Sequence, residues 1–335
     1  MAYRYDNLKL DKGMYRHAGQ SFTQVLEALD PSQQYKGTEM EGLDAFQRQL
    51  KRFDIRVSGQ NSDSIEKFFR NTESAALFPE YVSRAVMQGI EENDVLNSVI
   101  ATTTAIDGLD YRSIASITPD ADAPAINEGS VIPETKIQTQ QNLIPLFKRG
   151  RILTASYEAI RFQRLDVFTI ALKQIGAAIA RAQIKDAVNV LLNGDGNDNG
   201  AKVLSTESGE LTYNDLLNLW MSLYPYTMTT LIASPDVFSR ILSMDEFKDS
   251  AASRSFDGTG KVVTPFGAEL LRYDGMPEGT LLALDKNFAL EKVQAGNVVT
   301  EADKLIDRQL ERAAVTSTVG FAKIFADAAV ALKVN

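Results

Sequence analysis

The sequence predicts an α+β fold, chiefly because of two adjacent segments. Residues 165–192 are an unbroken run of apolar and helix-forming residues, and residues 111–151 are a long polar stretch with the composition of an extended hairpin. A helix of this length would measure roughly 40 Å, which is too long for a small compact core. A polar hairpin that projects from such a body needs a neighbour to lie on. Together the two segments predict a subunit that packs against copies of itself.

Charge, apolar runs and cysteine content exclude several classes of protein. The 335 residues contain no cysteine, and the net charge is −9. Disulfides and thiolate metal sites are therefore excluded. No apolar run approaches the ~20 residues of a membrane span, and the N-terminal residues lack a signal-peptide pattern, so we expect a chain that is made and kept in a cytoplasm. The densest basic cluster is only Lys148, Arg149 and Arg151, which does not predict tight binding to nucleic acid.

Residues 1–64 predict a polar N-terminal arm with two short helices. The first is expected at Phe22–Leu26 and ends before the Asp30–Pro31 pair. These helices have little to bury among themselves, so we expect them to lie on another surface, of the same chain or of a neighbour, and to gain most of their stability across interfaces. A weakly ordered arm is the alternative. The second helix is indicated by apolar residues at i, i+3, i+7 and i+10, which are Leu43, Phe46, Leu50 and Phe53.

Residues 65–110 predict a helix followed by extended chain. Pro79 suits a first helical position, and this helix is expected to end near Gly89. Residues 95–117 are rich in β-branched side chains and favour strands. The hairpin at 111–151 then follows, with its tip at Pro119–Thr135, where three prolines and many turn-forming residues occur.

The long helix lies within a segment at 152–208. Its middle, Gly176–Ala182, is rich in alanine and would let another backbone approach closely. The sequence NGDGNDNG at 193–200 is expected to end the helix abruptly. The apolar stripe of the helix recurs at the helical period and consists of Phe168, Leu172, Ile175 and Ile179.

Residues 209–292 predict a separate α/β unit. A helix is expected at 211–223 and a buried strand at 229–233, after which Ser234 and Pro235 open a further helix. Residues 293–335 alternate enough to be strands, and we expect them to return to the body that holds the long helix.

Few residues suggest catalysis. The single histidine, His17, cannot form a metal site alone, and neither a nucleophile elbow, a P-loop nor a dinucleotide motif is present. We therefore predict that the chain is not an enzyme and uses no cofactor. Asp195, Asn197 and Asn199 match the first ligands of a calcium loop, but its twelfth position is Thr206 rather than glutamate. We favour a turn there, with a weak cation site as the alternative.

The order of these parts resembles the major capsid proteins of tailed bacteriophages, which have the Hong Kong 97-like fold. The resemblance covers nearly the whole chain. Several stretches of the sequence are similar to those of capsid proteins from phages of Gram-positive bacteria. It is carried by FFRNTESAALFPEYVSRAV near residue 68, IDGLDYRSIA near 106, RGRILTASYEAIRFQRLDVFTIAL near 149 and DRQLERAAVTSTVGFAKIFADA near 307.

The resemblance implies a role for each segment. Residues 1–64 would be the N-terminal arm, which we expect to be retained, and 111–151 would be the extended E-loop that lies over the adjacent subunit. The peripheral domain would comprise 65–110, 152–208 with the spine helix at 165–192, and the strands at 293–335, while 209–292 would form the axial domain. Some relatives link an E-loop lysine covalently to a neighbour. The candidate assembly-interface residues are Pro119, Glu128, Glu134, Lys136, Lys148, Arg149 and Arg151, with Lys136 and Lys148 as crosslink candidates by position only.

The resemblance also implies the partners. Copies would form homo-pentamers and homo-hexamers that close into an icosahedral shell in the virion, assembled in the host cytoplasm around weakly contacted double-stranded DNA. A scaffolding protein and a portal are expected partners, a decoration protein is a further candidate, and no membrane is involved. An encapsulin-type nanocompartment shell is the alternative of the same fold, and an acidic α/β enzyme is the alternative of another class. A DNA-binding protein is disfavoured by the charge.

Overall fold

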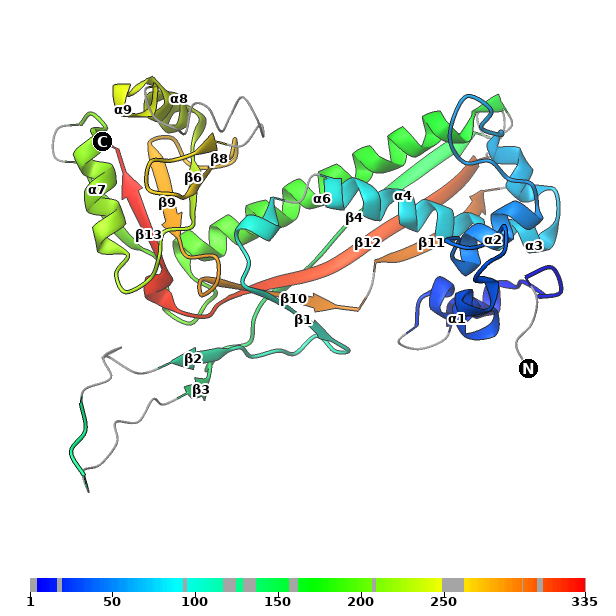
Figure 1. Ribbon diagram of the computed structural model, residues 1–335, viewed down its shortest axis with the longest axis horizontal. Coiled ribbons are helices and arrows are strands. Elements are labelled where there is room, and N and C mark those ends of the chain that lie inside the picture. Colours follow the sequence, from blue (N-terminus) through cyan, green and yellow to red (C-terminus); the bar gives the residue numbers. More distant parts are fainter. Residues whose placement is uncertain are drawn as a thin grey trace. The chain divides into compact units, whose positions relative to one another are not determined.

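The computed structural model describes residues 5–16, 20–92, 95–116, 125–128, 137–156, 162–206, 209–248, 262–296, 298–305 and 310–334. His17 and the candidate interface residues Pro119, Glu134 and Lys136 lie outside these ranges. The chain divides into two compact units (Figure 1). Unit 1 contains residues 1–94, 148–182 and 296–318, and unit 2 contains residues 95–147, 183–295 and 319–335. Within the described ranges, none of the helices has the length and apolar character needed to cross a membrane.

In unit 1 the N-terminal residues form short helices with well-defined starts. α1 (Phe22–Leu29) begins with a capping box between Ser21 and Gln24, and α2 (Ala45–Arg52) begins with one between Asp44 and Gln47. Each box satisfies backbone N–H groups that a helix start leaves without partners. Short 3₁₀ helices occupy Lys12–Arg16, Ser32–Tyr35 and Ile65–Phe69, and α3 (Thr72–Ala75) follows them.

The expectation that residues 1–64 bury little surface within their own chain is wrong. Phe22, Leu26, Phe46 and Leu50 are buried in one core cluster together with residues of the long helix. Residues 1–64 are expected to lie on a surface of their own chain or of a neighbour, and they pack on their own chain. The reason is that each short helix has one apolar face, and unit 1 supplies the partner for it.

A buried ion pair ties this N-terminal region together. Arg48 Nε lies 2.8 Å from Asp30 Oδ2, and neither side chain is accessible to solvent. The guanidinium also donates to the carbonyl oxygens of Asp30 and Leu43 and to Ser32 Oγ, and it stacks over the ring of Tyr35. A buried charge is tolerated only when it is paired and hydrogen-bonded in this way.

Two helices of unit 1 cross with their backbones in contact. α4 (Phe78–Glu92) passes the N-terminal part of α6 (Leu165–Asn193), the helix predicted over 165–192. A Cβ atom on Gly89 would lie 2.2 Å from Lys173 O, and one on Gly176 would lie 2.1 Å from Val86 O. The close approach predicted for the small residues near Gly176 is therefore confirmed. α4 is expected to end near Gly89 but continues to Glu92, so this glycine serves the crossing and not a cap.

The strands of unit 1 pack beside these helices. β11 (Val299–Leu305) pairs antiparallel with the first part of β12 (Leu310–Lys323). β4 (Leu146–Ser156) also pairs with β12 and, among the described strands, with no other. A Cβ atom on Gly150 of β4 would lie 2.4 Å from Val315 O, so glycine allows these two strands to approach closely.

In unit 2 the last part of β12 pairs with β10 (Leu290–Ala295), and β10 pairs in parallel with β1 (Thr102–Ile106), which follows a short 3₁₀ helix at Leu96–Ser98. β2 (Ile114–Ser116) and β3 (Ile137–Thr139) form a separate antiparallel pair, with Ile114 opposite Thr139 (Figure 1). The extended chain expected at 95–117 is thus interrupted by a helical turn and by the loop between β1 and β2.

Six described strands form a second sheet in unit 2, in the order β5-β13-β9-β6-β8-β7. Its central strands β6 (Thr230–Ala233) and β9 (Thr280–Leu284) are buried along their whole length, as continuous apolar runs predict. Helices α7 (Tyr213–Ser222), α8 (Pro235–Ser243) and α9 (Asp245–Lys248) accompany the sheet (Figure 1). The remaining strands are β5 (Lys202–Ser205), β7 (Val262–Val263), β8 (Glu269–Arg272) and β13 (Ala329–Lys333), with a 3₁₀ turn at Ala326–Ala328 before β13.

The compact units do not follow the predicted segments. The strands at 293–335 are expected to join the body of the long helix, but β13 is buried in the second sheet between β5 and β9. Likewise, β1 of the 65–110 segment and residues 183–206 of the 152–208 segment belong to unit 2. Strand pairing between distant residues decides these assignments, and no local pattern records it.

Candidate functional site

The base of the β2–β3 hairpin is the candidate functional site, because polar contacts attach it to unit 2 on both sides. Backbone pairing continues beyond the two strands, between the residues before β2 and those after β3. There Gln140 N donates to Ser113 O and Ile144 N donates to Tyr111 O, both at 2.9 Å. All of β3 is exposed, and 65% of the Ile137 surface is accessible. β3 therefore gains little from burial, and its position depends on the base of the hairpin.

Where the chain enters β2, the buried carboxylate of Glu291 accepts hydrogen bonds from three hydroxyl groups. Tyr111 Oη donates to Glu291 Oε1 at 2.6 Å, and Thr104 Oγ1 donates to the same oxygen at 2.5 Å. Ser113 Oγ donates to Glu291 Oε2. Burial, together with the neighbouring Glu291 carboxylate, raises the pKa of Tyr111. Glu291 thus joins β10 to β1 and to the segment that enters β2.

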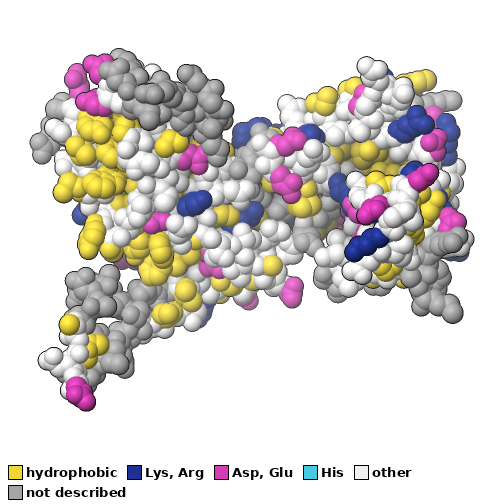
Figure 2. Space-filling view, viewed as in Figure 1, with side chains coloured by type: hydrophobic (Ala, Val, Ile, Leu, Met, Phe, Trp, Pro, Cys, Tyr) yellow, Lys and Arg dark blue, Asp and Glu magenta, His cyan; other side chains and the backbone are white. Residues whose placement is uncertain are grey.

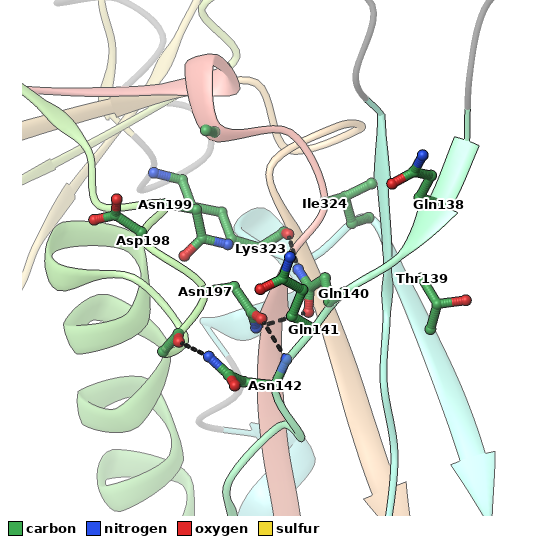
Figure 3. Close-up of a pocket in the computed structure, with 12 residues that line it drawn as sticks. Gln138, Thr139, Gln140, Gln141, Asn142, Asn197, Asp198, Asn199, Lys323 and Ile324 are labelled. Atoms are coloured by element: carbon green, nitrogen blue, oxygen red, sulfur yellow. Dashed lines mark hydrogen bonds between the residues drawn. The ribbon is translucent and has the colours of Figure 1, made fainter.

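Where the chain leaves β3, residues 140–142 form hydrogen bonds with the loop after α6. Gln140 Nε2 donates to Asp195 Oδ2 at 3.1 Å, and Asn197 Nδ2 donates to Gln140 Oε1 at 3.2 Å. Asn142 donates from its backbone N to Asn197 Oδ1 at 2.8 Å and from its side chain to Gly196 O at 2.7 Å (Figure 3). Four amide or carboxylate groups therefore fix the chain just before it leaves the hairpin.

The candidate cation loop is part of this anchor. Asp195 Oδ1 accepts from both nitrogen atoms of Asn197, and Asn199 Oδ1 accepts from Asp195 N. Gly194, Gly196 and Asp198 have positive φ angles, as in a tight turn. Among the described residues, no cluster of three or more His, Cys, Asp or Glu side chains could hold a metal ion. The loop oxygens serve N–H donors, which supports the turn.

A cavity of about 410 Å³ lies beside these contacts (Figure 3). Polar side chains supply most of its lining, and the ionisable ones are Asp198 and Lys323. One carboxylate and one amine with no shared contact do not make an acid–base pair or a nucleophile and its base. The arrangement can hold chain segments in place through hydrogen bonds. The full lining consists of Gln138, Thr139, Gln140, Gln141, Asn142, Gly196, Asn197, Asp198, Asn199, Lys323, Ile324 and Ala326.

Lys323, at the end of β12, connects this anchor to α6. Its side chain is 1% exposed, its backbone N donates to Asp195 Oδ2 at 2.8 Å, and its Nζ donates to Leu191 O at 3.3 Å. Leu191 O is one of the last carbonyls of α6, which lack partners within the helix. Burial lowers the pKa of Lys323 to about 8, although the charges of Asp327 and Asp195 act in the opposite direction.

The candidate interface residues that the structure describes lie on two different parts of the fold. Glu128 lies in the tip and is exposed. Lys148 and Arg151 are exposed on β4 and Arg149 is half-buried there. The hairpin expected at 111–151 is therefore too long, because β4 pairs with β12 and the second segment of unit 1 starts at Lys148.

Sequence reasoning misses most of the anchor residues. Glu291 and Lys323 have no local signal, since each acts on residues more than a hundred positions away. Asp195 belongs to a recognisable turn motif, and that motif is the only clue that the sequence offers to this anchor.

Comparison with known proteins identifies the family. Residues 140–330 match the family model described as phage capsid protein. No curated protein sequence matches the chain. The virus-like particle from Pyrococcus furiosus aligns with a TM-score of 0.52 and 14% identity, covering 76% of this chain and 98% of its own.

Two further solved structures share the fold. The capsid of a native GTA particle aligns with a TM-score of 0.53 and 16% identity over 71% of this chain and 89% of its own. A structure from Microbacterium phage Oxtober96 aligns with a TM-score of 0.51 and 10% identity over 72% of this chain and 91% of its own. The fold is Hong Kong 97-like, as the resemblance in sequence implied. With more than half of its length matched by the family model, the chain belongs to the phage capsid protein family and is a capsid shell protein.

Proposed function

We propose that this protein is the major subunit of an icosahedral capsid, in which copies associate as pentamers and hexamers and enclose double-stranded DNA. The observation that carries the proposal is an exposed β2–β3 hairpin whose base is held by Glu291 and by the Asp195 loop. A strand pair that is fixed at its base and exposed at Ile114 and along β3 is suited to lie on a neighbouring subunit. The structure of the GTA capsid, which was computed with C5 symmetry, supports a five-fold ring in that relative.

A second exposed surface supports association between copies. Figure 2 shows hydrophobic side chains on the surface of the region that Figure 1 labels α7. Trp220, Met221 and Tyr224 are exposed there, Tyr224 to 81%. Trp220 stacks on Phe266 with ring centroids 6.2 Å apart. Aromatic residues and methionine are enriched at protein interfaces, so this surface is a candidate contact within a ring.

The other partners follow from the same proposal. The net charge of −9 favours weak contact with packaged DNA, since strong binding needs basic groups that neutralise phosphates. A scaffolding protein and a portal are expected during assembly in the host cytoplasm, and a decoration protein is a further candidate. The subunit acts through geometry, and we propose no enzymatic activity for it.

Deletion of Pro119–Thr135 tests the proposal. The purified full chain should form closed particles that are visible by electron microscopy and elute in the void volume of a sizing column. The deleted chain should stay soluble, keep the circular dichroism spectrum of the full chain, and form no shells. Normal particles from the deleted chain would remove the hairpin from the assembly mechanism. Failure of the full chain to assemble under any condition, with or without a scaffolding protein, would refute the capsid proposal itself.

A further inference from the structure

The loop that follows α6 contains two Asn-Gly pairs a few residues apart. Asn193 precedes Gly194, and Asn199 precedes Gly200. In an Asn-Gly pair the backbone nitrogen of the glycine can attack the side-chain carbonyl carbon of the asparagine, because no Cβ atom on the glycine hinders the approach. The asparagine then becomes a succinimide. Since the two pairs have the same sequence, their surroundings in the fold decide which of them reacts.

The fold protects Asn193. This asparagine is the last residue of α6, and the nitrogen that would attack it, Gly194 N, donates to Val190 O at 2.8 Å. The carboxamide of Asn193 is turned back along the helix, where its Nδ2 donates to Asn189 Oδ1 at 2.8 Å. Both reacting groups of the first pair are therefore engaged in other contacts.

The surroundings of Asn199 favour the reaction. No described residue accepts a hydrogen bond from Gly200 N. Asp195 N donates to Asn199 Oδ1 at 3.0 Å, and this oxygen gains negative charge when a nitrogen adds to the carbonyl carbon, so the donor stabilises the intermediate. Asn199 Oδ1 and Gly200 N both face Gly194, where an added Cβ atom would lie 2.8 Å from the oxygen and 3.0 Å from the nitrogen.

Water can reach this pair. The Asn199 side chain is half-buried and borders the cavity at the base of the hairpin (Figure 3), and Gly200 is exposed. The second step of the reaction, which is hydrolysis of the succinimide, needs only water.

We infer that Asn199 is a site of spontaneous deamidation and that the fold selects it over Asn193. Gly200 N forms a bond to Asn199 Cγ, the carboxamide C–N bond breaks, and the proton lost by Gly200 N leaves with the released ammonia. Water then opens the succinimide at one of its two carbonyl groups. Position 199 becomes an aspartate or an isoaspartate.

The reaction adds a carboxylate to the loop that holds the hairpin base. Asp195 and Asp198 already carry negative charge in this loop, and like charges repel each other. An isoaspartate also adds a carbon atom to the backbone. Because Asp195 and Asn197 accept the hydrogen bonds from Gln140 and Asn142, the modified loop should hold the hairpin base less firmly.

Mass spectrometry of stored protein tests the inference. The purified full chain is incubated for several days at mildly alkaline pH, either folded or unfolded in urea. Trypsin then releases residues 186–202 as one peptide that contains both Asn-Gly pairs. In the folded chain, deamidation should accumulate at Asn199 and not at Asn193. In the unfolded chain it should occur at both positions.

Gly200→Ala is the matched control. A Cβ atom there comes no closer than 3.4 Å to Leu192 O, and the backbone of Gly200 is outside the left-handed region, so the fold should be kept. The methyl group hinders the attacking nitrogen, and deamidation at Asn199 should be slower than in the wild-type chain. Asn199→Asp reproduces one product. In this variant the amide hydrogen of Asn142 should exchange with solvent faster than in the wild-type chain, while unfolding stays cooperative.

Three outcomes overturn the assignment of the site. They are an unmodified Asn199 in the folded chain when the unfolded chain reacts, equal deamidation at Asn193 and Asn199 in the folded chain, and no slowing by Gly200→Ala. Exchange of the Asn142 amide at the wild-type rate in Asn199→Asp would refute the effect on the hairpin base. None of these results concerns the ability of the subunits to form shells, so the capsid proposal would stand.

Discussion

At the scale of single residues, the position of the hairpin base depends on the carboxylates of Glu291 and Asp195, which accept hydrogen bonds from several neighbouring residues. Glu291 accepts three hydroxyl hydrogen bonds, and Asp195 accepts from Gln140, Asn197 and the backbone of Lys323. Lys323 is the least favourable member of this group, because no carboxylate of the described residues is in direct contact with its buried amine. Such a charge reduces the stability of the folded chain at neutral pH.

Replacing Lys323 with methionine should remove a pH-dependent part of the stability. The pKa of Lys323 is about 8 in the folded chain and has the ordinary value of 10.5 when unfolded. Between these values the unfolded state binds more protons, so the free energy of unfolding should rise with pH. The shift corresponds to at most about 3 kcal/mol.

Urea unfolding of both chains between about pH 7 and pH 10 measures this effect, because the contribution of the tyrosines is common to the two chains. The wild-type chain should gain stability relative to Lys323→Met above about pH 8. Parallel curves for the two chains would show that this amine does not titrate as described.

At the scale of elements, the contact between α4 and α6 decides the packing of unit 1. Gly89 and Gly176 bring two helix backbones together where any side chain would collide with a carbonyl oxygen or an amide. Elsewhere along the same two helices, Tyr81 Oη donates to Leu165 O at 2.9 Å. Residues far apart in the sequence therefore meet through main-chain atoms, and the contact requires glycine on both helices.

Gly89→Ala should destabilise the chain although alanine is the better helix former. Helix propensity alone favours alanine over glycine by about 1 kcal/mol, but its Cβ would lie 2.2 Å from Lys173 O. Because both groups are held by their helices, the crossing must open, and we expect a net loss of about 1–3 kcal/mol. Thermal unfolding checks the sign. Gly108→Ala is the control, since a Cβ there meets nothing within 4 Å; stabilisation by Gly89→Ala would contradict the close crossing.

At the scale of the whole molecule, the subunit has its own cores and association adds to them. The apolar residues of the first 64 positions are part of the main core of unit 1, and two further clusters fill unit 2. Among the described residues, exposed apolar side chains occur on the hairpin strands, at Ile114 and Ile137, and on α7, at Trp220 and Met221. Stability of the subunit and assembly of the shell should therefore be separable by mutation.

Removal of residues 1–64 should prevent folding of unit 1. The truncation takes away Phe22, Leu26, Phe46 and Leu50 and exposes the surface that they cover. We expect an insoluble chain or one that binds a hydrophobic dye and lacks a cooperative unfolding transition. The Pro119–Thr135 deletion is the matched comparison and should unfold cooperatively. A truncated chain that unfolds like the full chain but fails to assemble would restore the interpretation of these residues as an assembly arm.

The sequence by itself determined the elements that depend on neighbouring residues. The helical period over 165–192 predicts α6, and the buried strand expected at 229–233 is β6. Several stretches of the sequence are enough to indicate the capsid family, and the match to the family model confirms it. Periodicity, capping and turn chemistry act over a few residues, so one chain is enough to read them.

Only the tertiary structure decided which distant residues contact one another and which sheet or core each element joins. Tyr111 and Glu291 are 180 positions apart and meet at 2.6 Å, β13 enters a sheet of strands from earlier in the chain, and the N-terminal helices pack on their own subunit. Such contacts depend on how the whole chain closes, because a carboxylate or a strand edge has many compatible partners in the sequence and only the fold selects one.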